Sequence, residues 1–483
     1  MSTIFLQRRS FKAGAFVRCL LAFLLIRLNA LVLNANIFPQ FMGTIPEARE
    51  FATLAFIIVV LLLTVLAQRK PGFIHAWAFL TVSLIAISLG VVLLYFGITL
   101  SFASAILMGV CLMNVGTAWV FTLVGLALLR LSLTQAFFSL SLAMIANFLS
   151  QSILIALPLV VVLPLLLVSN ITVIILTAPL ANPLLDALST SATPADLSIT
   201  HPLSFLPLSH TLFLSFFIFT VGFGFALTYG SVNGVPPLLS LSTIPLILIV
   251  LISFFRKRRM NIDRIYLIAA LLMIAGYLVI PVLPKDLALQ SAFQPANTLI
   301  YAGSECFTLV IWAVLIAVGK RNLLGALPVI TFGSFVNAFG TLVGTSLGHL
   351  INGISLLHTS LEPIAATLMV FSIIVYILAT ARSFSFEQTA EEIKDFTAPP
   401  VLPDSSQLEQ GYKQIAEEYR LTPRETDIIE LLARGRNIQT IQSKLVLSRN
   451  TIKTHVRNIY AKLDVHSQQE LIDLVEQKAR ELT

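Results

Sequence analysis

Charged residues are scarce in this sequence: they make up 11% of its 483 residues, whereas 57% are apolar and the mean hydropathy is +0.90. Soluble globular proteins carry about 25% charged residues. A chain this poor in charge does not fit an ordinary soluble enzyme or a disordered protein. The composition therefore predicts a membrane protein.

Cysteine is also rare, and the three cysteines, Cys19, Cys111 and Cys306, all lie within apolar segments. Their number and spacing exclude a disulfide framework, and the seven histidines show no metal-ligand spacing on one helix face. The sequence also lacks a nucleophile–base constellation and paired carboxylates placed for catalysis. We therefore expect no metal, no cofactor and no enzymatic activity.

The basic residues are unevenly distributed along the chain. Residues 1–383 contain 18 Lys and Arg against 8 Asp and Glu, while residues 384–483 contain 13 against 16. The net charge of +7 thus arises in the apolar part, where basic residues set the membrane topology. By itself it does not indicate nucleic-acid binding.

Twelve apolar segments are long enough to cross a bilayer as helices, which takes about 20 residues each. We place them near 15–37, 49–67, 74–96, 101–129, 132–156, 159–178, 206–230, 236–255, 264–283, 297–319, 324–351 and 361–381. The fifth and sixth are separated least clearly, because Pro158 and Pro164 interrupt a nearly continuous apolar stretch. The first contains Arg18 and Arg27 and no cleavage site, so we expect a retained span and not a signal peptide.

The basic residues of alternate connecting loops set the predicted orientation. These loops contain Arg8, Arg9, Lys12, Arg69, Lys70, Arg130, Arg256, Lys257, Arg258, Arg259, Arg264, Lys320, Arg321 and Arg382, whereas the opposite loops contain only Arg49 and Lys285. Because basic loops stay on the cytoplasmic side, we expect both termini in the cytoplasm. An even number of spans satisfies this requirement.

The longest connection within the apolar part, residues 181–207, follows the sixth span and divides the bundle into two halves of six. This layout resembles the major facilitator superfamily, which implies two six-helix halves around a central cavity. The loop over 66–72 agrees with the family's loop between spans two and three only in its basic pair and in Gly72. The missing acidic residue argues against ordinary transport.

Two ionisable residues lie at membrane depth, where charges are costly and indicate function: Arg27 in the first span and Glu305 in the tenth. In the facilitator layout both spans line the cavity. Two alternatives follow. Either the two residues pair or hold a charged ligand, or Arg27 reaches the membrane surface and Glu305 is satisfied by neighbours such as Ser304 or Thr308.

As a hypothesis, a small ligand binds in this cavity to Arg27 or Glu305 together with Asn114 and Trp119. The glycine-rich segment 333–348 lacks the spacing of a phosphate-binding loop. It predicts close helix packing instead.

The composition changes near residue 383. The residues that follow are polar and acidic, contain Pro399, Pro400 and Pro403, and show no apolar period. This predicts a linker over 384–416. The chain therefore divides into a transmembrane domain over 1–383, the linker, and a C-terminal domain over 417–483.

Four short helices are predicted in the C-terminal domain. The first begins at a capping box formed by Thr422 and Glu425, with Pro423 at its first position, and ends at Gly435. The second covers about 437–445.

The third helix begins at Ser448, which is a good N-cap, and reaches about Leu463. A second capping box, formed by Ser467 and Glu470, opens the fourth helix. Two helices joined by a short turn, the second of them basic, form a helix-turn-helix layout.

The third helix has an apolar face and a basic face. At about 100° per residue, its apolar residues form one narrow stripe that predicts packing against the domain core: Ile452, Val456, Ile459 and Leu463. The side turned away from this stripe carries Asn450, Lys453, Thr454 and Arg457. In a major groove Lys and Arg can donate to guanine, Asn can pair with adenine, and a Thr methyl can contact the thymine methyl.

The segment 421–471 closely resembles the LuxR-type helix-turn-helix domain of bacterial transcription regulators. The matching positions are Leu421 to Glu425, Leu432 to Gly435, Ser448, Thr451, Lys453, His455, Ile459, Tyr460, Lys462, Leu463 and Ser467. By this resemblance Lys453, Thr454 and Arg457 face bases. Arg449, Thr451 and Lys462 lie against phosphates, and the last helix forms a homodimer on DNA. Gln442 departs from the family, which usually has Ala there.

These predictions describe an all-α, membrane-embedded one-component transcription regulator of the bacterial inner membrane. We expect the bundle to sense a small molecule and the C-terminal domain to bind promoter DNA. Such a fusion resembles the membrane-bound LuxR-family regulators of Actinobacteria. Two alternatives remain open: a major-facilitator-type transporter that carries a DNA-binding regulatory domain, and a bundle that only holds the regulator at the membrane.

Overall fold

The computed structural model describes residues 13–41, 44–45, 47–190, 193–200, 202–228, 243–256, 261–280, 295–355, 361–380, 384–393, 405–433, 438–445, 447–465 and 468–481. Within these ranges every secondary-structure element is a helix. The predicted all-α class is therefore confirmed.

The apolar part of the chain consists of two sets of long helices. The first set is α1 (Ala13–Val32), α2 (Ala48–Arg69), α3 (Ala76–Thr99), α4 (Ala103–Leu128), α5 (Leu133–Ile155) and α6 (Leu159–Thr190). The second set is α8 (Thr211–Thr228), α9 (Ile244–Arg256), α10 (Ile262–Val279), α11 (Pro295–Arg321), α12 (Leu323–Ser355) and α13 (Leu361–Thr380). The short helix α7 (Pro194–Thr200) connects the two sets.

Eleven of the described helices are long and apolar enough to cross a membrane, so the chain is a multi-pass membrane protein. The twelfth predicted span, over 236–255, coincides with α9, which is 13 residues long, and the structure describes that span only from residue 243 onward. The uncertain boundary at Pro158 falls between α5 and α6, and Pro164 lies inside α6.

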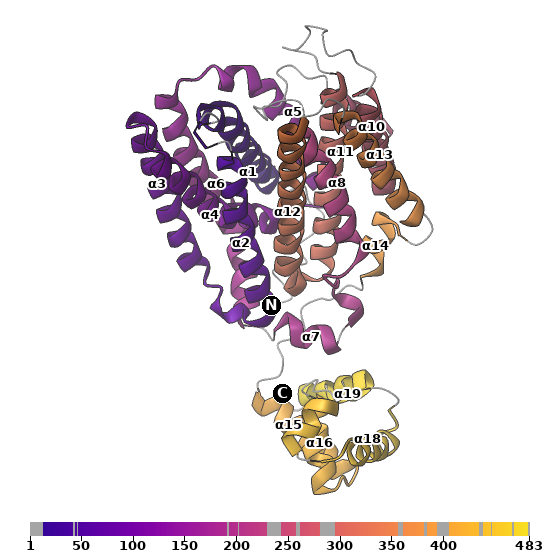
Figure 1. Cartoon of the computed structure of the whole chain (residues 1–483). Helices are drawn as coiled ribbons and strands as arrows, with labels where there is room; N and C mark the ends of the chain where they lie inside the picture. Colours follow the sequence, from indigo (N-terminus) through magenta and orange to yellow (C-terminus); the bar gives the residue numbers. More distant parts are fainter. Residues whose placement is uncertain are drawn as a thin grey trace.

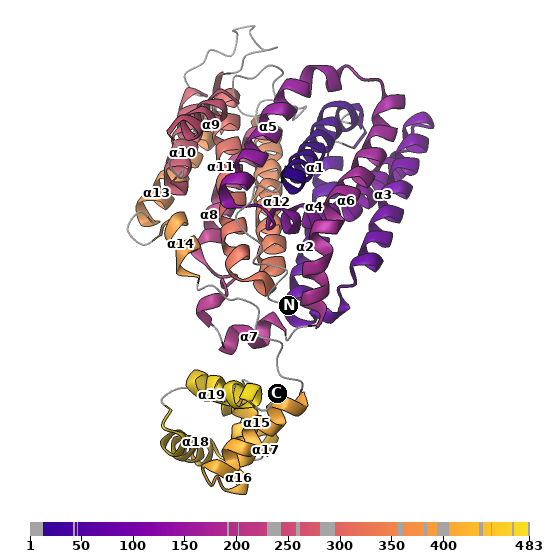
Figure 2. The same cartoon turned by 180° about the vertical axis from the view of Figure 1, so that it is seen from behind.

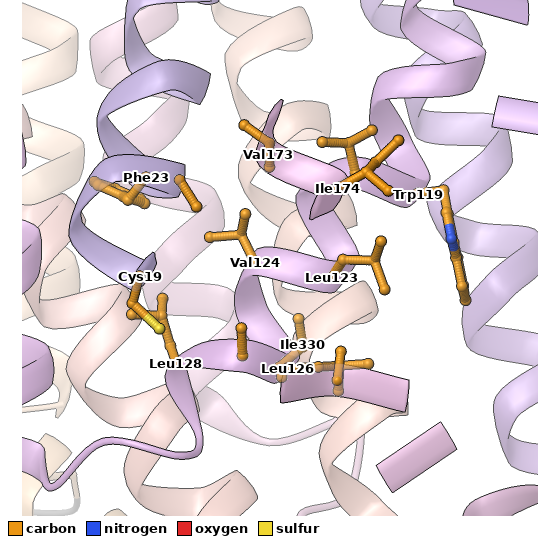
Figure 3. Close-up of a cluster of buried hydrophobic side chains, with 14 of the residues drawn as sticks. Cys19, Phe23, Trp119, Leu123, Val124, Leu126, Leu128, Val173, Ile174 and Ile330 are labelled. Atoms are coloured by element: carbon orange, nitrogen blue, oxygen red, sulfur yellow. The ribbon is translucent and has the colours of Figure 1, made fainter. Parts of the chain in front are cut away.

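Two hydrophobic cores divide the bundle, and Figures 1 and 2 show the two groups of helices side by side. The first core is formed mainly by α1 to α6 and the second mainly by α8 to α13, which confirms the predicted six-plus-six division. Trp312 of α11 and Ile330 of α12 belong to the first core and so join the halves. Figure 3 shows part of this core, where Phe23, Val124 and Val173 come from α1, α4 and α6.

The glycine-rich segment of α12 allows it to approach α8 closely. A Cβ atom on Gly340 would lie 2.0 Å from Thr220 Oγ1, and one on Gly344 would lie 2.1 Å from the carbonyl oxygen of Val221. Neither distance can accommodate a side chain. The close packing predicted for residues 333–348 is therefore confirmed.

The structure differs from the expected linker over 384–416. Helix α14 (Phe386–Glu392) packs against α10 and α11 of the bundle, and α15 (Ser405–Glu418) packs against the last helix of the C-terminal domain. The physical reason is burial: Phe386 is enclosed in the bundle, while Tyr412 and Ile415 lie in the core of the C-terminal domain. Because the segment is mostly acidic and polar, its few apolar residues did not predict these two helices.

The C-terminal domain has a hydrophobic core of its own. It comprises α15, α16 (Pro423–Ala433), α17 (Ile438–Leu445), α18 (Arg449–Leu463) and α19 (Gln468–Glu481). The four predicted helices are present, with α15 as a fifth. The expected helix end at Gly435 and the capping box that includes Ser467 fall outside the described residues. In Figures 1 and 2 this domain lies at the end of the bundle where α7 is found.

Candidate DNA-binding face and membrane cavity

The start of α16 is fixed by the predicted capping box. The Thr422 N–H donates to Glu425 Oε2 at 2.8 Å, and the Glu425 N–H donates to Thr422 Oγ1 at 3.3 Å. Each residue thus satisfies a backbone donor that the first helical turn leaves without a partner. Glu425 is 3% exposed, so its charge is held inside the domain.

Lys462, at the end of α18, pairs with this buried carboxylate. Its Nζ atom donates to Glu425 Oε2 at 2.6 Å and to the carbonyl oxygen of Arg420 at 3.3 Å. Burial by itself raises the pKa of the Glu425 carboxyl, but the hydrogen bonds from Lys462 and Thr422 outweigh it and hold the pKa below its usual range. The ammonium of Lys462 thus joins α18 to α16, and its expected contact with phosphate stays a prediction.

The start and the inner face of α18 agree with the sequence. Ser448 Oγ accepts a hydrogen bond from the Thr451 N–H at 3.2 Å, as expected of an N-cap. The predicted apolar stripe faces the core, with Ile452 and Ile459 fully buried and Leu463 4% exposed. Helix α18 is therefore held by one face, and the orientation of its opposite face is fixed.

The opposite face of α18 presents polar and basic groups to the surface. Asn450, Lys453, Thr454 and Arg457 are all exposed. The Thr454 hydroxyl donates to the carbonyl oxygen of Asn450 at 3.0 Å, so its hydrogen atom is used within the helix. Thr454 can thus offer its methyl group to a partner, as contact with a thymine methyl requires.

The residues expected near phosphates occupy the first turn of α18. Thr451 is exposed, and its Oγ1 is 2.7 Å from Ser448 Oγ. Arg449 is the first residue of α18. The N-terminus of a helix favours an anionic group such as a phosphate.

A second candidate site lies between the two halves of the bundle, where Arg27 Nη2 of α1 donates to Glu305 Oε1 of α11. The pairing alternative drawn from the sequence is therefore the one observed. Both side chains are partly enclosed, and within the described residues Arg27 Nε and Glu305 Oε2 are buried without a hydrogen-bond partner. An unused donor and an unused acceptor thus lie next to a satisfied ion pair.

These two residues line a cavity of about 140 Å³. Much of its wall is aromatic and was not predicted: Phe23, Phe121, Phe219, Phe223, Phe307 and Trp312. Polar atoms come from Ser304, Thr308, Thr220, Asn337 and Thr341. Aromatic walls with a few convergent polar groups are the lining of small-molecule sites, and this cavity is smaller than the about 300–1,000 Å³ usual for them. In the sequence these aromatic residues do not differ from the many others that pack a membrane bundle.

Asn114 and Trp119 do not line this cavity, so the structure corrects their assignment to it. Trp119 is 2% exposed and packs on Phe79, with ring centroids 5.0 Å apart, inside the first core (Figure 3). Asn114 Nδ2 donates to the carbonyl oxygen of Val110 on its own helix at 2.9 Å. Both lie on α4, whose cavity residue is Phe121. Across the described ranges, no three His, Cys, Asp or Glu side chains gather as a metal site would require.

Comparison with known proteins identifies the C-terminal part. The family of bacterial regulatory proteins named luxR matches residues 419–475. Similar proteins include the uncharacterized response regulatory protein YgeK of Escherichia coli (strain K12), 51% identical over 53 residues, which are 11% of this chain and 36% of that protein. The uncharacterized transcriptional regulatory protein YhcZ of Bacillus subtilis (strain 168) is 45% identical over 47 residues, 10% of this chain and 22% of that protein.

The chain thus spans about a third or less of the length of these relatives, and the likeness is confined to the helix-turn-helix domain. Among solved structures, two of the Escherichia coli fucose:proton symporter, a major facilitator superfamily transporter, are similar to this chain. They cover 77% and 78% of this chain and 98% and 99% of theirs, with 15% and 16% identity and TM-scores of 0.45 and 0.46. Residues 419–475 form a LuxR-type helix-turn-helix domain, joined to a membrane bundle.

Proposed function

We propose that this protein, a multi-pass membrane bundle that carries a LuxR-type helix-turn-helix domain, is a one-component transcription regulator of the bacterial inner membrane, with both termini in the cytoplasm. The observation that carries the proposal is the outer face of α18. Its four exposed side chains, Asn450, Lys453, Thr454 and Arg457, are presented by a helix whose other face is buried. Such a helix suits the major groove, and the domain binds promoter DNA as a dimer through α19.

The membrane bundle supplies the input. A small molecule binds in the cavity beside Arg27 and Glu305, and its binding shifts the bundle between conformations. This requires that the ligand bind one conformation more tightly than the other. Polar atoms of the pair that lack partners and the aromatic walls support this assignment.

The experiment is genome-wide DNA occupancy of the full-length protein. We compare the wild type with the double variant Lys453→Ala, Arg457→Ala. A matched control, Lys413→Ala with Arg424→Ala, also removes two exposed cations but takes them from α15 and α16. We expect specific sites in the wild type and the control, and their loss in the α18 variant. Equal losses in the two double variants would assign binding to total charge and contradict the proposal.

The ligand assignment has a separate test. Compounds that change occupancy in the wild type are applied to Arg27→Ala and Glu305→Gln, with Trp119→Phe as the control outside the cavity. We expect the first two variants to lose the response and the control to retain it. Intact responses in the first two would remove the ligand from this cavity, and occupied sites with no response to any compound would favour a bundle that only anchors the domain.

A further inference from the structure

Helix α14 is attached to the bundle at both of its ends. At its start, Asp263 of α10 accepts hydrogen bonds from Ser385 Oγ at 2.5 Å and from the Phe386 N–H at 2.7 Å. At its end, Arg321 of α11 donates from Nη1 to the carbonyl oxygens of Glu391 and Ile393, both at 2.8 Å. Hydrogen bonds to ionised groups are about twice as strong as neutral ones. The segment between bundle and DNA-binding domain is therefore docked over its first part.

An aromatic side chain anchors α14 between these two attachments. Phe386 is 1% exposed, and its ring centroid lies 4.8 Å from that of Tyr266. Ala390 and Ile393 are buried on the same side. If α14 left the bundle, the Phe386 ring, a large apolar surface of this helix, would become exposed.

Phe386 packs partly against a residue that also forms the wall of the cavity. Phe307 lines the cavity and stacks on Phe219, with ring centroids 4.3 Å apart. Its ring also meets Phe386 edge to face, at 6.3 Å and 81°. Phe307 lies two residues after Glu305 on α11, the same helix that holds the end of α14 through Arg321. Helix α11 thus carries Glu305 of the ion pair, Phe307 of the shared wall and Arg321, which holds the end of α14.

We propose that the cavity controls the docking of α14 through the contact between Phe307 and Phe386. A change at the cavity that moves Phe307 removes one of the side chains against which Phe386 packs. Helix α14 then leaves the bundle. The chain between bundle and Ser405 then begins before Phe384 instead of after Ile393. The reach of the DNA-binding domain grows, because the span of a connecting chain increases with residue number. The inference rests on the proposed function only in that the cavity takes a ligand.

The test measures the docking of α14 directly in the full-length protein in lipid vesicles. Thr389 on α14 is 3% exposed, so a thiol in the variant Thr389→Cys reacts with a maleimide only when α14 opens. The labelling rate of the parent protein, which contains Cys19, Cys111 and Cys306, is subtracted from that of each variant. We expect slow labelling in the otherwise unchanged protein.

Two further variants establish that the attachment at Asp263 holds α14. Asp263→Asn removes the charge that caps its start, and we expect labelling to rise by about tenfold, the loss typical of a hydrogen bond to an ionised group. Glu391→Gln alters an exposed side chain, while the backbone carbonyl oxygen of residue 391 still accepts from Arg321, so the labelling of this variant should match that of the parent. Unchanged labelling in Asp263→Asn would show that this attachment does not hold α14 and would overturn the proposal.

The decisive comparison uses two phenylalanines of the same cavity. Phe307→Leu alters the residue that contacts Phe386, whereas Phe223→Leu alters a wall residue whose ring meets Tyr301 instead. We expect the labelling rate to rise several-fold in Phe307→Leu and to stay at the parent rate in Phe223→Leu. Equal labelling of both variants would indicate general loosening and overturn the proposal, as would slow labelling in Phe307→Leu. Leucine keeps most of the apolar volume, and thermal unfolding confirms that each variant is folded.

This readout needs neither DNA nor a ligand. Absence of specific DNA sites would contradict the proposed function and leave the labelling result standing. Conversely, DNA occupancy together with slow labelling of Phe307→Leu would retain the regulator and reject control of α14 by the cavity wall.

Discussion

Glu425 joins two helices of the DNA-binding domain through one carboxylate. Its Oε2 atom accepts from the Thr422 N–H at the start of α16 and from Lys462 at the end of α18. Helix α18 is therefore oriented both by its buried stripe and by an ion pair at its far end. Two lysines on this helix, Lys453 and Lys462, thus have different structural roles.

The two lysines of α18 should separate stability from DNA binding. Lys462→Ala leaves Glu425 buried without its cation and should lower the free energy of unfolding by about 1–2 kcal/mol, the low end for a hydrogen bond to a charged group because Lys462 is partly exposed. Lys453→Ala should leave stability unchanged and weaken DNA binding. Urea unfolding of residues 405–483, which have their own core, and DNA titration measure the two effects. Equal unfolding midpoints in the two variants would contradict the assignment.

The same carboxylate predicts a pH dependence. Since the pKa of Glu425 is lowered in the folded domain, its ionised form stabilises the fold above the unfolded value of about 4.3, and this stabilisation is lost as the pH falls through the folded pKa. Glu425→Gln should therefore be less stable than wild type near about pH 7, with the gap narrowing below about pH 4. Urea midpoints at several pH values measure the gap. A gap that stays constant into acid would show that Glu425 is not the group responsible.

At the residue scale, the sequence predicted contacts between residues close together in the chain but not contacts between residues far apart in it. The capping box and the N-cap Ser448 follow from residues three apart, and both are confirmed. The partner of Lys462 lies 37 residues away on another helix, so no local pattern indicates it. Whether Lys453 and Arg457 contact bases stays a prediction.

At the scale of elements, α15 is part of the DNA-binding domain. Tyr412 and Ile415 lie in its core, and Lys478 of α19 pairs with Glu418 at 2.8 Å. Helix α15 thus packs into this domain although it precedes residues 419–475, where the resemblance to other regulators lies.

Helix α15 should contribute to the stability of the domain. Ile415 is fully buried, so Ile415→Ala should lower the free energy of unfolding by about 2–4 kcal/mol through the lost contacts and the cavity left behind. Lys413→Ala, an exposed change on the same helix, should be close to neutral. Urea unfolding of residues 405–483 measures both. A neutral Ile415→Ala would place α15 outside the domain.

The contact between α8 and α12 should depend on the missing side chains of α12. Gly344→Ala places a methyl group against the Val221 carbonyl and must push the helices apart, whereas Gly353→Ala meets nothing within 4 Å. Alanine otherwise favours a helix over glycine by about 1 kcal/mol. We expect Gly344→Ala to lower the thermal stability of the detergent-purified protein and Gly353→Ala to keep or raise it. A stable Gly344→Ala would contradict the close approach.

Elements with strong apolar content were predictable, and weakly apolar ones were not. Eleven predicted spans coincide with candidate membrane helices because length and hydropathy define them. Helices α14 and α15 depend on one or two buried side chains each, within acidic surroundings. For α15 the spacing of Tyr412, Ile415 and Tyr419 was the available signal, since it places the first two on one face of the helix and Tyr419 directly after its end.

At the scale of the whole molecule, the ion pair between Arg27 and Glu305 joins the two halves of the bundle. Their depth in the first and tenth spans gave the pair as one of two alternatives, because the expected layout places both spans at a central cavity. The same reasoning misplaced Asn114 and Trp119. A position on a helix does not reveal which of its faces turns toward the cavity, and α4 directs Phe121 there instead.

The pair predicts a distinctive pattern of variants across the two halves. Arg27→Met or Glu305→Met alone leaves one partly buried charge without a partner, which costs less than the about 3–5 kcal/mol of a fully buried pair, whereas the double variant leaves no unpaired charge. We expect each single variant to lower the thermal stability of the purified full-length protein and the double variant to recover most of the loss. Additive losses in the double variant would show that the two charges are stabilised independently. Recovery would establish that α1 and α11 are coupled through these side chains, so that a ligand that separates them acts on both halves of the bundle.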